Sequence, residues 1–409
     1  MPTDRIKAAL LSELEELEQR GVRKAPERVV VGYLPAREGR GPRFLLAGQG
    51  DKPFLKMNSN GYLGLAQDPR LIEAEDTASR ELGVNPGAVR FIDGTTKYHQ
   101  RLEERLAAFH GCEAAKIFSC AYMANLGVAI ALCNKSTYVI SDELNHNSIV
   151  RALRIAGVPG ENKGIFKHND VADLERCLDA VPAGIQRVIV IFDGVFSMRG
   201  DYAPLREIVA ACKMRHRRFR DGVLTIVDDS HGTAAYGPTG RGTPEVAGES
   251  DVDVITSTLG KAFGAEGGYV AGTAEIIEIV RQRADTYIYT NPVSPGAANA
   301  GLASLAIVDS DEGRGKIAAV KANAEYFRSG IETLGFETIP GVHPIVPVLI
   351  RDTARVRAMV KALFEHGILA TGLTFPVVPV GDETIRIQLS AAHTRADLDY
   401  VLETFGRIK

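Results

Sequence analysis

The chain has 409 residues, of which 45% are hydrophobic and 24% charged, a composition typical of a globular protein with a sizeable core and more than one ordinary domain. Its net charge of -3 argues against a surface that binds nucleic acid or a membrane. The five cysteines include no C-x-x-C pair and their number is odd, so we expect no metal site, no disulfide framework and a reducing cytoplasm as the compartment.

Residues 1–55 are predicted to form a helix and an arm. Apolar residues recur at helical spacing in the order Ile6, Ala9, Leu10, Leu14 and Leu17. With acids and bases between them, they predict an amphipathic helix that either covers the chain's own surface or packs on a partner subunit. The same charges make residues 1–25 unlike a signal peptide, and no stretch of the chain reaches membrane-spanning length.

From residue 56 onward, short apolar runs alternate with stretches of helical spacing. The runs lie at residues 114–118, 137–140, 187–192, 224–227, 252–255 and 268–271. Polar residues or glycines bound each run, as is typical of strands buried on both faces of a mostly parallel sheet. Helical spacing lies between them, for example at residues 99–110 and 172–180. This order predicts a three-layer α/β domain over residues 56–295, with its ligand at the carboxyl ends of the strands.

The pattern changes near residue 296. A long helical segment is predicted from Ala297 towards Leu334, followed by a strand at 343–350, a helix at 354–366, a strand at 384–390 and a closing helix from Arg395. This order predicts a smaller α+β domain over residues 296–409, packed on the larger one.

Three chemically distinctive residues follow predicted strands. Asp228 and His231 come after the run at 224–227, and Lys261 comes after the run at 252–255. This set suits pyridoxal phosphate, which a lysine holds as a Schiff base and whose ring nitrogen stays protonated beside a carboxylate. Lys261 is then the amine nucleophile and later the general base, Asp228 faces the ring nitrogen, and His231 hydrogen-bonds the phenolic oxygen.

Other interpretations of these residues agree less well with the sequence. A P-loop needs Ser or Thr at the position of Ala262 and a glycine at that of Ile255. A nicotinamide-binding dehydrogenase needs a G-x-G-x-x-G after a strand, and no strand here is followed by one. A solvated lysine after a turn explains a Gly-Lys pair alone, but it does not explain the upstream Asp228 and His231. A silent homologue that serves only as a partner subunit would lack Lys261.

Six motifs stand in one order along the chain. They occupy residues 60–65 (Asn-Gly-Tyr-Leu-Gly-Leu), 141–149 (Ser-Asp-Glu-Leu-Asn-His-Asn-Ser-Ile), 193–198 (Asp-Gly-Val-Phe-Ser-Met), 228–232 (Asp-Asp-Ser-His-Gly), 258–261 (Thr-Leu-Gly-Lys) and 390–394 (Ser-Ala-Ala-His-Thr). Together they resemble the α-oxoamine synthases, which are fold-type I pyridoxal phosphate enzymes that join an amino acid to an acyl-CoA. The resemblance implies an acyltransferase that works as a homodimer with a shared active site.

Some segments point to particular members of that family. Residues 87–95 and 375–379 most resemble 2-amino-3-ketobutyrate CoA ligase, also called glycine C-acetyltransferase. Residues 231–233 and 310–313 look more like 8-amino-7-oxononanoate synthase. We therefore expect glycine and acetyl-CoA to condense to a 2-amino-3-oxo acid or an α-aminoketone plus CoA. The alternatives are a decarboxylating synthase with a different acyl-CoA, and a pyridoxal phosphate aminotransferase that does not use CoA.

The cofactor phosphate needs donors. Residues 119–125 follow the predicted strand at 114–118 and open a helical stretch, so the backbone N–H groups of Ala121 and Tyr122 would point at an anion. The resemblance implies that these two positions bind the phosphate and that Thr258 adds a hydroxyl group. It also implies that Thr290 reaches the phosphate across the dimer interface, so that a monomer cannot complete the site.

The resemblance implies four further site residues. His146 stacks on the cofactor ring and takes part in proton transfers, and Ser197 lies near the phenolic oxygen and the acyl substrate. Arg386 binds the α-carboxylate of the amino acid, for which a planar guanidinium is suited, and Asn60 assists it. Gly61 departs from the Asn or Asp that is usual in the family at that position.

Overall fold

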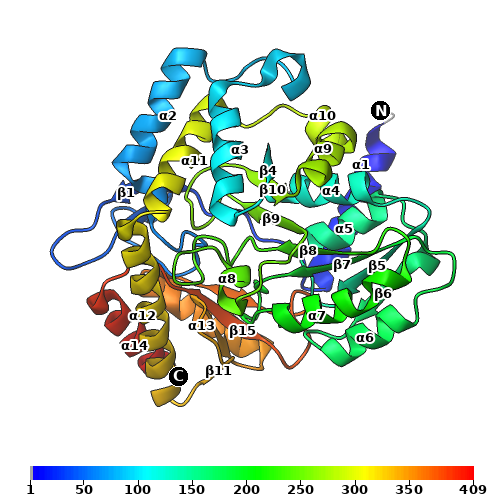
Figure 1. Cartoon of the computed structure of the whole chain (residues 1–409). Coiled ribbons are helices and arrows are strands. Elements are labelled where there is room, and N and C mark those ends of the chain that lie inside the picture. Colours follow the sequence, from blue (N-terminus) through cyan, green and yellow to red (C-terminus); the bar gives the residue numbers. More distant parts are fainter. Residues whose placement is uncertain (1–2) are drawn as a thin grey trace.

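The computed structural model describes residues 3–409, and a seven-stranded sheet lies at its centre (Figure 1). Its strands, in spatial order, are β4 (Ala114–Phe118), β10 (Gly268–Gly272), β9 (Val254–Thr258), β8 (Val223–Asp228), β7 (Arg187–Asp193), β5 (Thr137–Asp142) and β6 (Lys163–Phe166). Strand β10 runs in the direction opposite to that of the other strands of this sheet. The predicted mostly parallel α/β sheet is therefore confirmed, with β6 as an additional edge strand that the sequence analysis did not identify.

Helices cover both faces of this sheet. They are α3 (Lys97–His110), α4 (Ala121–Leu132), α5 (Asn147–Ile155), α6 (Val171–Asp179), α7 (Leu205–Arg215), α8 (Thr243–Ala247), α9 (Ala274–Arg283) and α10 (Asp285–Ile288). Val188 and Val190 of β7 pack with α6 and α7, whereas Ile189 and Ile191 pack with α4 and α5. Successive side chains of a strand point to opposite faces, so one continuous apolar run supplies both helical layers with a surface to bury.

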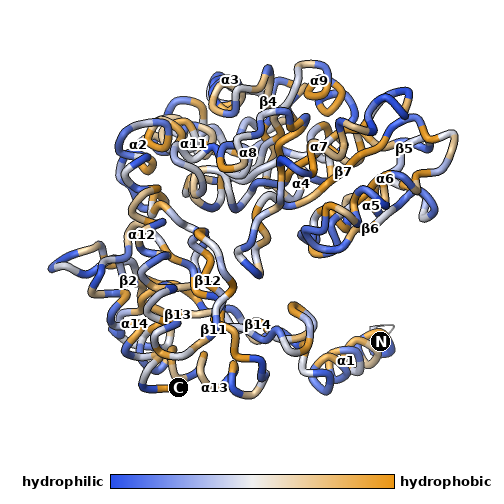
Figure 2. Tube along the Cα trace, turned by 60° about the horizontal axis from the view of Figure 1, so that its bottom comes forward, coloured by the Kyte–Doolittle hydropathy of each residue, from blue (hydrophilic) through white to orange (hydrophobic). Residues whose placement is uncertain are grey.

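A second, antiparallel sheet lies in the C-terminal part, to one side of the large sheet (Figure 2). Its order is β11 (Glu337–Thr338), β12 (Ile345–Leu349), β15 (Thr384–Gln388) and β14 (Thr371–Leu373), and its helices are α12 (Asp311–Thr333), α13 (Thr353–Glu365) and α14 (Arg395–Ile408). These elements agree with the predicted α+β order. The bounds of the two domains at residues 56–295 and 296–409 stay a prediction.

The predicted single helix from Ala297 to Leu334 is wrong. The structure has two helices there, α11 (Pro295–Val308) and α12, and α11 packs against α2 (Pro69–Leu82) and α3 of the large part. The Ser310 hydroxyl accepts a hydrogen bond from the Gly313 N–H at 3.3 Å, so it caps a new helix start. The apolar spacing on both sides of this cap concealed the break.

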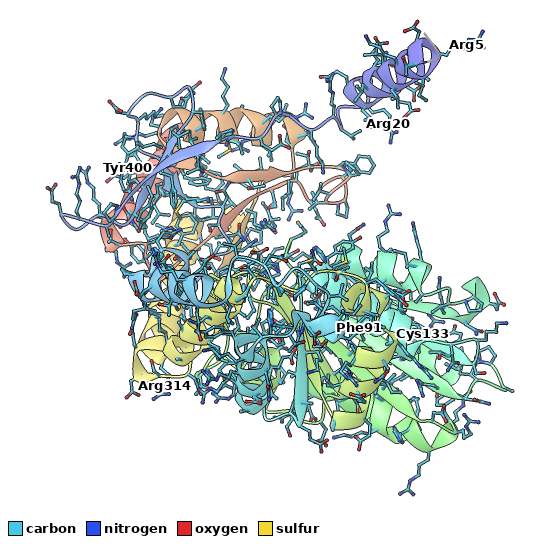
Figure 3. The ribbon with its side chains drawn as sticks, turned by 90° about the horizontal axis from the view of Figure 1, so that it is seen from above. Arg5, Arg20, Phe91, Cys133, Arg314 and Tyr400 are labelled. Carbon is cyan, nitrogen blue, oxygen red and sulfur yellow. The ribbon has the colours of Figure 1, made fainter. Side chains whose placement is uncertain are left out.

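The N-terminal arm joins the C-terminal part. Its elements are α1 (Thr3–Gln19), β1 (Val30–Leu34), β2 (Arg43–Leu46) and β3 (Leu55–Lys56), and β3 pairs in parallel with β13 (Ile368–Leu369). The predicted helix α1 is confirmed, but it extends away from the rest of the chain and buries none of its side chains (Figure 3). Among residues 3–409, no helix combines the length and apolar character needed to cross a membrane.

Candidate active site

The carboxyl ends of three neighbouring strands bring the acidic and basic residues together. In the ladder, Asp193 at the end of β7 pairs with Asp228 at the end of β8, and Asp228 pairs with Thr256 of β9. Thr258 ends β9 and Lys261 lies in the loop directly after it. Strand alignment therefore brings Asp228 and Lys261 to one edge of the sheet, as the sequence predicted.

Lys261 lies in a partly buried position among charged groups. Burial lowers the pKa of its ammonium group, and the carboxylates of Asp228 and Asp193 oppose that effect. A lowered pKa favours the neutral amine, which is the form that attacks a carbonyl and later accepts a proton. The surroundings of Lys261 thus differ from those of a solvated lysine after a turn.

Asp228 is held by two hydrogen bonds. Its Oδ2 accepts from Asn125 Nδ2 at 2.6 Å and its Oδ1 accepts from the Ser230 N–H at 3.0 Å. Asn125 also accepts from the Thr256 hydroxyl at 2.7 Å and donates to Ser148 Oγ at 2.9 Å. The carboxylate therefore has a fixed orientation inside a buried polar network. The sequence analysis did not identify Asn125, since an isolated Asn in a helix carries no pattern.

His146 is the N-cap residue of α5 and is fixed at both its backbone and its ring. Its backbone N–H donates to Asp193 Oδ2 at 2.9 Å, and its Nδ1 lies 2.8 Å from Ser148 Oγ. Burial lowers the pKa of the His146 ring, so the neutral form prevails at neutral pH. Burial together with the charge of Asp228 raises the pKa of Asp193 well above its usual range. The backbone support from Asp193 is a second feature that the sequence analysis missed.

His231 is held by two aromatic neighbours. Its Nδ1 lies 2.7 Å from the Tyr62 hydroxyl, and its carbonyl oxygen lies 2.8 Å from Nε2 of His343. Burial and the nearby Lys261 lower the pKa of the His231 ring well below its usual range. Tyr62 belongs to the motif at residues 60–65, but the sequence analysis did not assign it a contact with His231.

The start of α4 offers an anion site. Cys120 precedes the helix and makes no side-chain cap, so the first N–H groups of α4, including those of Ala121 and Tyr122, have no helical partner. Gly268 of β10 packs so tightly against this start that a Cβ would lie 2.1 Å from the Ala121 nitrogen. In the sheet, Gly268 pairs with Thr258, and this register brings Thr258 towards the start of α4. Backbone donors at a helix N-terminus with an adjacent hydroxyl suit a phosphate.

Within one chain, Thr290 is held by a hydrogen bond inside its own turn. It follows α10, and its hydroxyl donates to the carbonyl oxygen of Thr286 at 2.6 Å. The neighbouring Tyr289 side chain is 74% exposed, so this turn faces outward from the single chain. The contribution of Thr290 across a subunit interface stays a prediction.

Arg386 connects the C-terminal sheet to the large part. It lies on β15, and one guanidinium nitrogen donates to the carbonyl oxygen of Ser197 at 2.8 Å while its buried Nε has no partner. Gln388, two residues further along the strand, donates to the Oδ1 of Asn60. Because residues two apart on a strand share a face, Arg386 and the Asn60–Gln388 pair lie side by side. An unpaired buried donor beside an amide pair suits a carboxylate ligand.

A histidine clamp supports the loop that carries Ser197. His168 Nδ1 lies 3.1 Å from Asp142 Oδ1 at the end of β5, and its Nε2 lies 3.1 Å from Asp201 Oδ2. The edge of the His168 ring also packs on Phe196, with 4.3 Å between ring centroids. The two carboxylates raise the pKa of His168 to about 9, although burial opposes them. The cation therefore joins two loops at the carboxyl edge of the sheet.

We expect this clamp to make stability depend on pH. The folded pKa of about 9 exceeds the ordinary value of 6.5, so the stabilisation is complete below pH 6.5 and is lost as the pH rises through 9. Its size is at most about 3 kcal/mol. In urea unfolding, His168→Gln should lower the free energy of unfolding at pH 6 and change it little at pH 10. Equal losses at the two pH values would show that the charge of His168 does not contribute.

Comparison with known proteins decides the family. The class I and II aminotransferase family matches residues 52–405 of this chain. The chain belongs to that family. Its curated relatives include 8-amino-7-oxononanoate synthase of Thermosipho melanesiensis, 39% identical over 359 residues, 87% of this chain and 88% of the relative. Human mitochondrial 2-amino-3-ketobutyrate coenzyme A ligase is 37% identical over 405 residues, 98% of this chain and 92% of the relative.

Solved structures agree with this placement in the α-oxoamine synthases. Serine palmitoyltransferase of Sphingomonas wittichii superposes with a TM-score of 0.87 at 29% identity, over 100% of this chain and 97% of that one. The enzyme of S. paucimobilis, solved with a pyridoxal phosphate–myriocin adduct, gives a TM-score of 0.86 at 28% identity, over the same shares of each chain. The predicted family is confirmed. This synthase is a pyridoxal phosphate enzyme that condenses an amino acid with an acyl-CoA.

The residues of this synthase agree with that cofactor. The lysine with a lowered pKa, the oriented carboxylate of Asp228 and the uncapped start of α4 meet the needs of an aldehyde, a ring nitrogen and a phosphate, respectively. The partnerless Ser230 hydroxyl lies two residues beyond Asp228 and is a further buried polar atom at this edge. These groups of one chain therefore fit the aldehyde, the ring nitrogen and part of the phosphate site of the cofactor.

Proposed function

We propose that Lys261, Asp228, His146 and His231 form the reaction centre. Pyridoxal phosphate supplies an electron sink that stabilises a negative charge at the amino acid α-carbon. Lys261 holds the cofactor and then removes the α-proton, and Asp228 keeps the ring nitrogen protonated. The ring of His146 packs on the cofactor plane and His231 donates to the phenolic oxygen. The pKa shifts support these roles, because burial lowers the pKa of Lys261 from its ordinary value and keeps the two histidine rings neutral at neutral pH.

The phosphate is proposed to lie at the start of α4. The N–H groups of Ala121 and Tyr122 and the hydroxyl of Thr258 donate to it, and Thr290 of a partner subunit completes the site. The exposed apolar side of α1, with Leu10 49% and Leu14 40% exposed, supports a homodimer in which α1 packs on the other subunit. Sedimentation of the protein as a monomer at micromolar concentration would exclude this arrangement.

The amino acid is proposed to be glycine, with its carboxylate on Arg386 and Asn60. Ser197 and Met198 continue from this point into a cavity of about 120 Å³, which we assign to the acyl group. The lining of this cavity is mainly apolar and includes one arginine, Arg199. The Nε of Arg199 lies 2.8 Å from Asp201 Oδ2, and its Nη1 lies 3.6 Å from Asp382 Oδ2. A short neutral acyl chain is compatible with this lining, whereas an acyl chain with a terminal carboxylate would face an already paired cation. This cavity carries the proposal of acetyl-CoA.

A second candidate is the formation of 8-amino-7-oxononanoate. Several curated relatives at 36–39% identity bear that name, including proteins from Symbiobacterium thermophilum and Geobacter sulfurreducens. The carbon skeleton of that product requires a seven-carbon acyl group with a terminal carboxylate and an amino acid whose side chain is one methyl group, joined with release of CoA and with loss of the amino acid carboxylate as CO2. The remaining alternative, an aminotransferase reaction without CoA, is not proposed, because the chain belongs to the α-oxoamine synthases.

The experiment is a thiol-release assay with glycine, alanine and serine against acetyl-, malonyl-, succinyl-, pimeloyl- and palmitoyl-CoA. We expect the highest kcat/KM for glycine with acetyl-CoA. A preference for alanine with pimeloyl-CoA would favour the second candidate. Amino transfer to a 2-oxo acid without thiol release would contradict the proposed condensation.

Arg386→Gln should raise the KM for the amino acid by about 100-fold, because a buried charged donor pair to the carboxylate is lost. The KM for the acyl-CoA should change little. Arg386→Lys is the matched variant and should give an intermediate KM, since lysine keeps the charge but not the planar pair of donors. An unchanged amino acid KM in both variants would exclude Arg386 as the carboxylate ligand.

A further inference from the structure

One chain of hydrogen bonds links two residues of the reaction centre that lie on different elements. It runs from Asp228 Oδ2 to Asn125 Nδ2 at 2.6 Å, from Asn125 Nδ2 to Ser148 Oγ at 2.9 Å, and from Ser148 Oγ to His146 Nδ1 at 2.8 Å. Asn125 and Ser148 are each only 1% exposed, so water does not compete for these contacts. Asp228 comes from β8, Asn125 from α4, and Ser148 from α5.

The direction of every bond in this chain follows from donor and acceptor chemistry. Asp228 as a carboxylate only accepts, so the amide nitrogen of Asn125 faces it; the Thr256 hydroxyl donates to Asn125 Oδ1 at 2.7 Å and agrees with that orientation. The second amide hydrogen of Asn125 then points at Ser148 Oγ. Ser148 has one hydroxyl hydrogen, which is left for Nδ1 of His146.

A backbone hydrogen bond also indicates that His146 Nδ1 is an acceptor. The N–H of Ser148 also donates to His146 Nδ1, at 3.2 Å, so this ring nitrogen accepts two hydrogen bonds and carries no proton in the neutral ring. The proton of neutral His146 is therefore on Nε2.

We propose that Asn125 and Ser148 are positioning residues that pass the orientation of the Asp228 carboxylate to the ring of His146, so that His146 presents a protonated Nε2 to the reacting groups. This inference rests on the proposed function for its consequence in catalysis, but the tautomer itself does not depend on the substrate. It gives Nε2 of His146 the role of a hydrogen-bond donor to substrate oxygen and not that of a base. Proton removal is then left to Lys261.

The tautomer is measured by nitrogen NMR on full-length protein labelled with ¹⁵N-histidine, with and without pyridoxal phosphate. His146→Gln identifies the signals by their loss. We expect the coupling pattern of the Nε2–H tautomer in the wild type, and an added Nδ1–H population in Asn125→Leu and Ser148→Ala. The Nδ1–H tautomer in the wild type, or an unchanged tautomer ratio in both variants, would overturn the proposal.

Kinetic measurements distinguish a positioning role of Asn125 and Ser148 from a merely structural role. Asn125→Leu and Ser148→Ala should lower kcat by about 10- to 100-fold, the range for a lost hydrogen bond to a charged or reacting group, and leave the amino acid KM nearly unchanged. Thr404→Val is the control, because it removes another buried hydroxyl, in α14, that donates to the carbonyl oxygen of Tyr400. A loss of kcat in the control equal to that in the two variants would contradict a specific role. If the tautomer is as expected but glycine and acetyl-CoA do not react, only the proposed substrates fail.

Discussion

Replacing Lys261 by alanine is expected to lower turnover by about 10⁴-fold and to remove the visible absorption of the bound cofactor. The reason is that one amine supplies both the covalent anchor and the base for the α-proton, and a positioned base alone contributes 10² to 10⁴ in rate. Burial lowers the pKa of Lys261 at the carboxyl edge of the sheet. Absorption spectra and initial rates of thiol release measure the two effects.

A matched control keeps this test specific. Lys321 on α12 is 61% exposed at its side chain, so Lys321→Ala should retain both colour and turnover. Borohydride reduction followed by peptide mass analysis should place the cofactor on Lys261 in the wild type. A colourless wild type after reconstitution, or a label on another lysine, would contradict the proposed anchor.

Asp228→Asn is expected to lower kcat by about 10²- to 10³-fold without release of the cofactor. An amide has nearly the same shape but cannot act as the anion that holds a proton on the ring nitrogen, so the loss reflects a charge-assisted hydrogen bond within a buried network. The hydrogen bond from Asn125 Nδ2 to Asp228 Oδ2, at 2.6 Å, shows how closely this carboxylate is held. Rates of thiol release and the visible spectrum distinguish loss of activity from loss of cofactor.

The adjacent Asp229 provides the control for this variant. It is fully buried, and its Oδ1 accepts from the Thr243 hydroxyl at 2.6 Å, so its contacts stabilise a loop and not the cofactor. Asp229→Asn should lower the free energy of unfolding and leave kcat within about threefold of the wild type, as expected for a residue outside the reaction centre. If Asp229→Asn lowered kcat as much as Asp228→Asn, the second carboxylate of the pair would be the partner of the ring nitrogen.

The proposed site was predictable where chemistry and strand position coincide. Asp228, His231 and Lys261 follow buried apolar runs, and the carboxyl ends of parallel strands lie at one edge of the sheet. Arg386 and Asn60 were predictable only through resemblance, because they are more than 300 residues apart and meet through Gln388. Asn125, Tyr62 and Gln388 were not predicted, since they act through contacts with elements distant in the chain, which no periodic pattern records.

The amino-acid sequence by itself determined the α/β class, six of the seven strands of the large sheet and the identity of the lysine, aspartate and histidines, because apolar periodicity and residue chemistry are local properties. Only the tertiary structure decided where α11 ends and α12 begins, and which side chains orient Asp228, His146 and His231. The orientation of these side chains depends on hydrogen bonds between elements distant in the chain, such as the bond from Asn125 to Asp228. Spacing along the chain carries no record of such contacts; they exist only once the layers have packed.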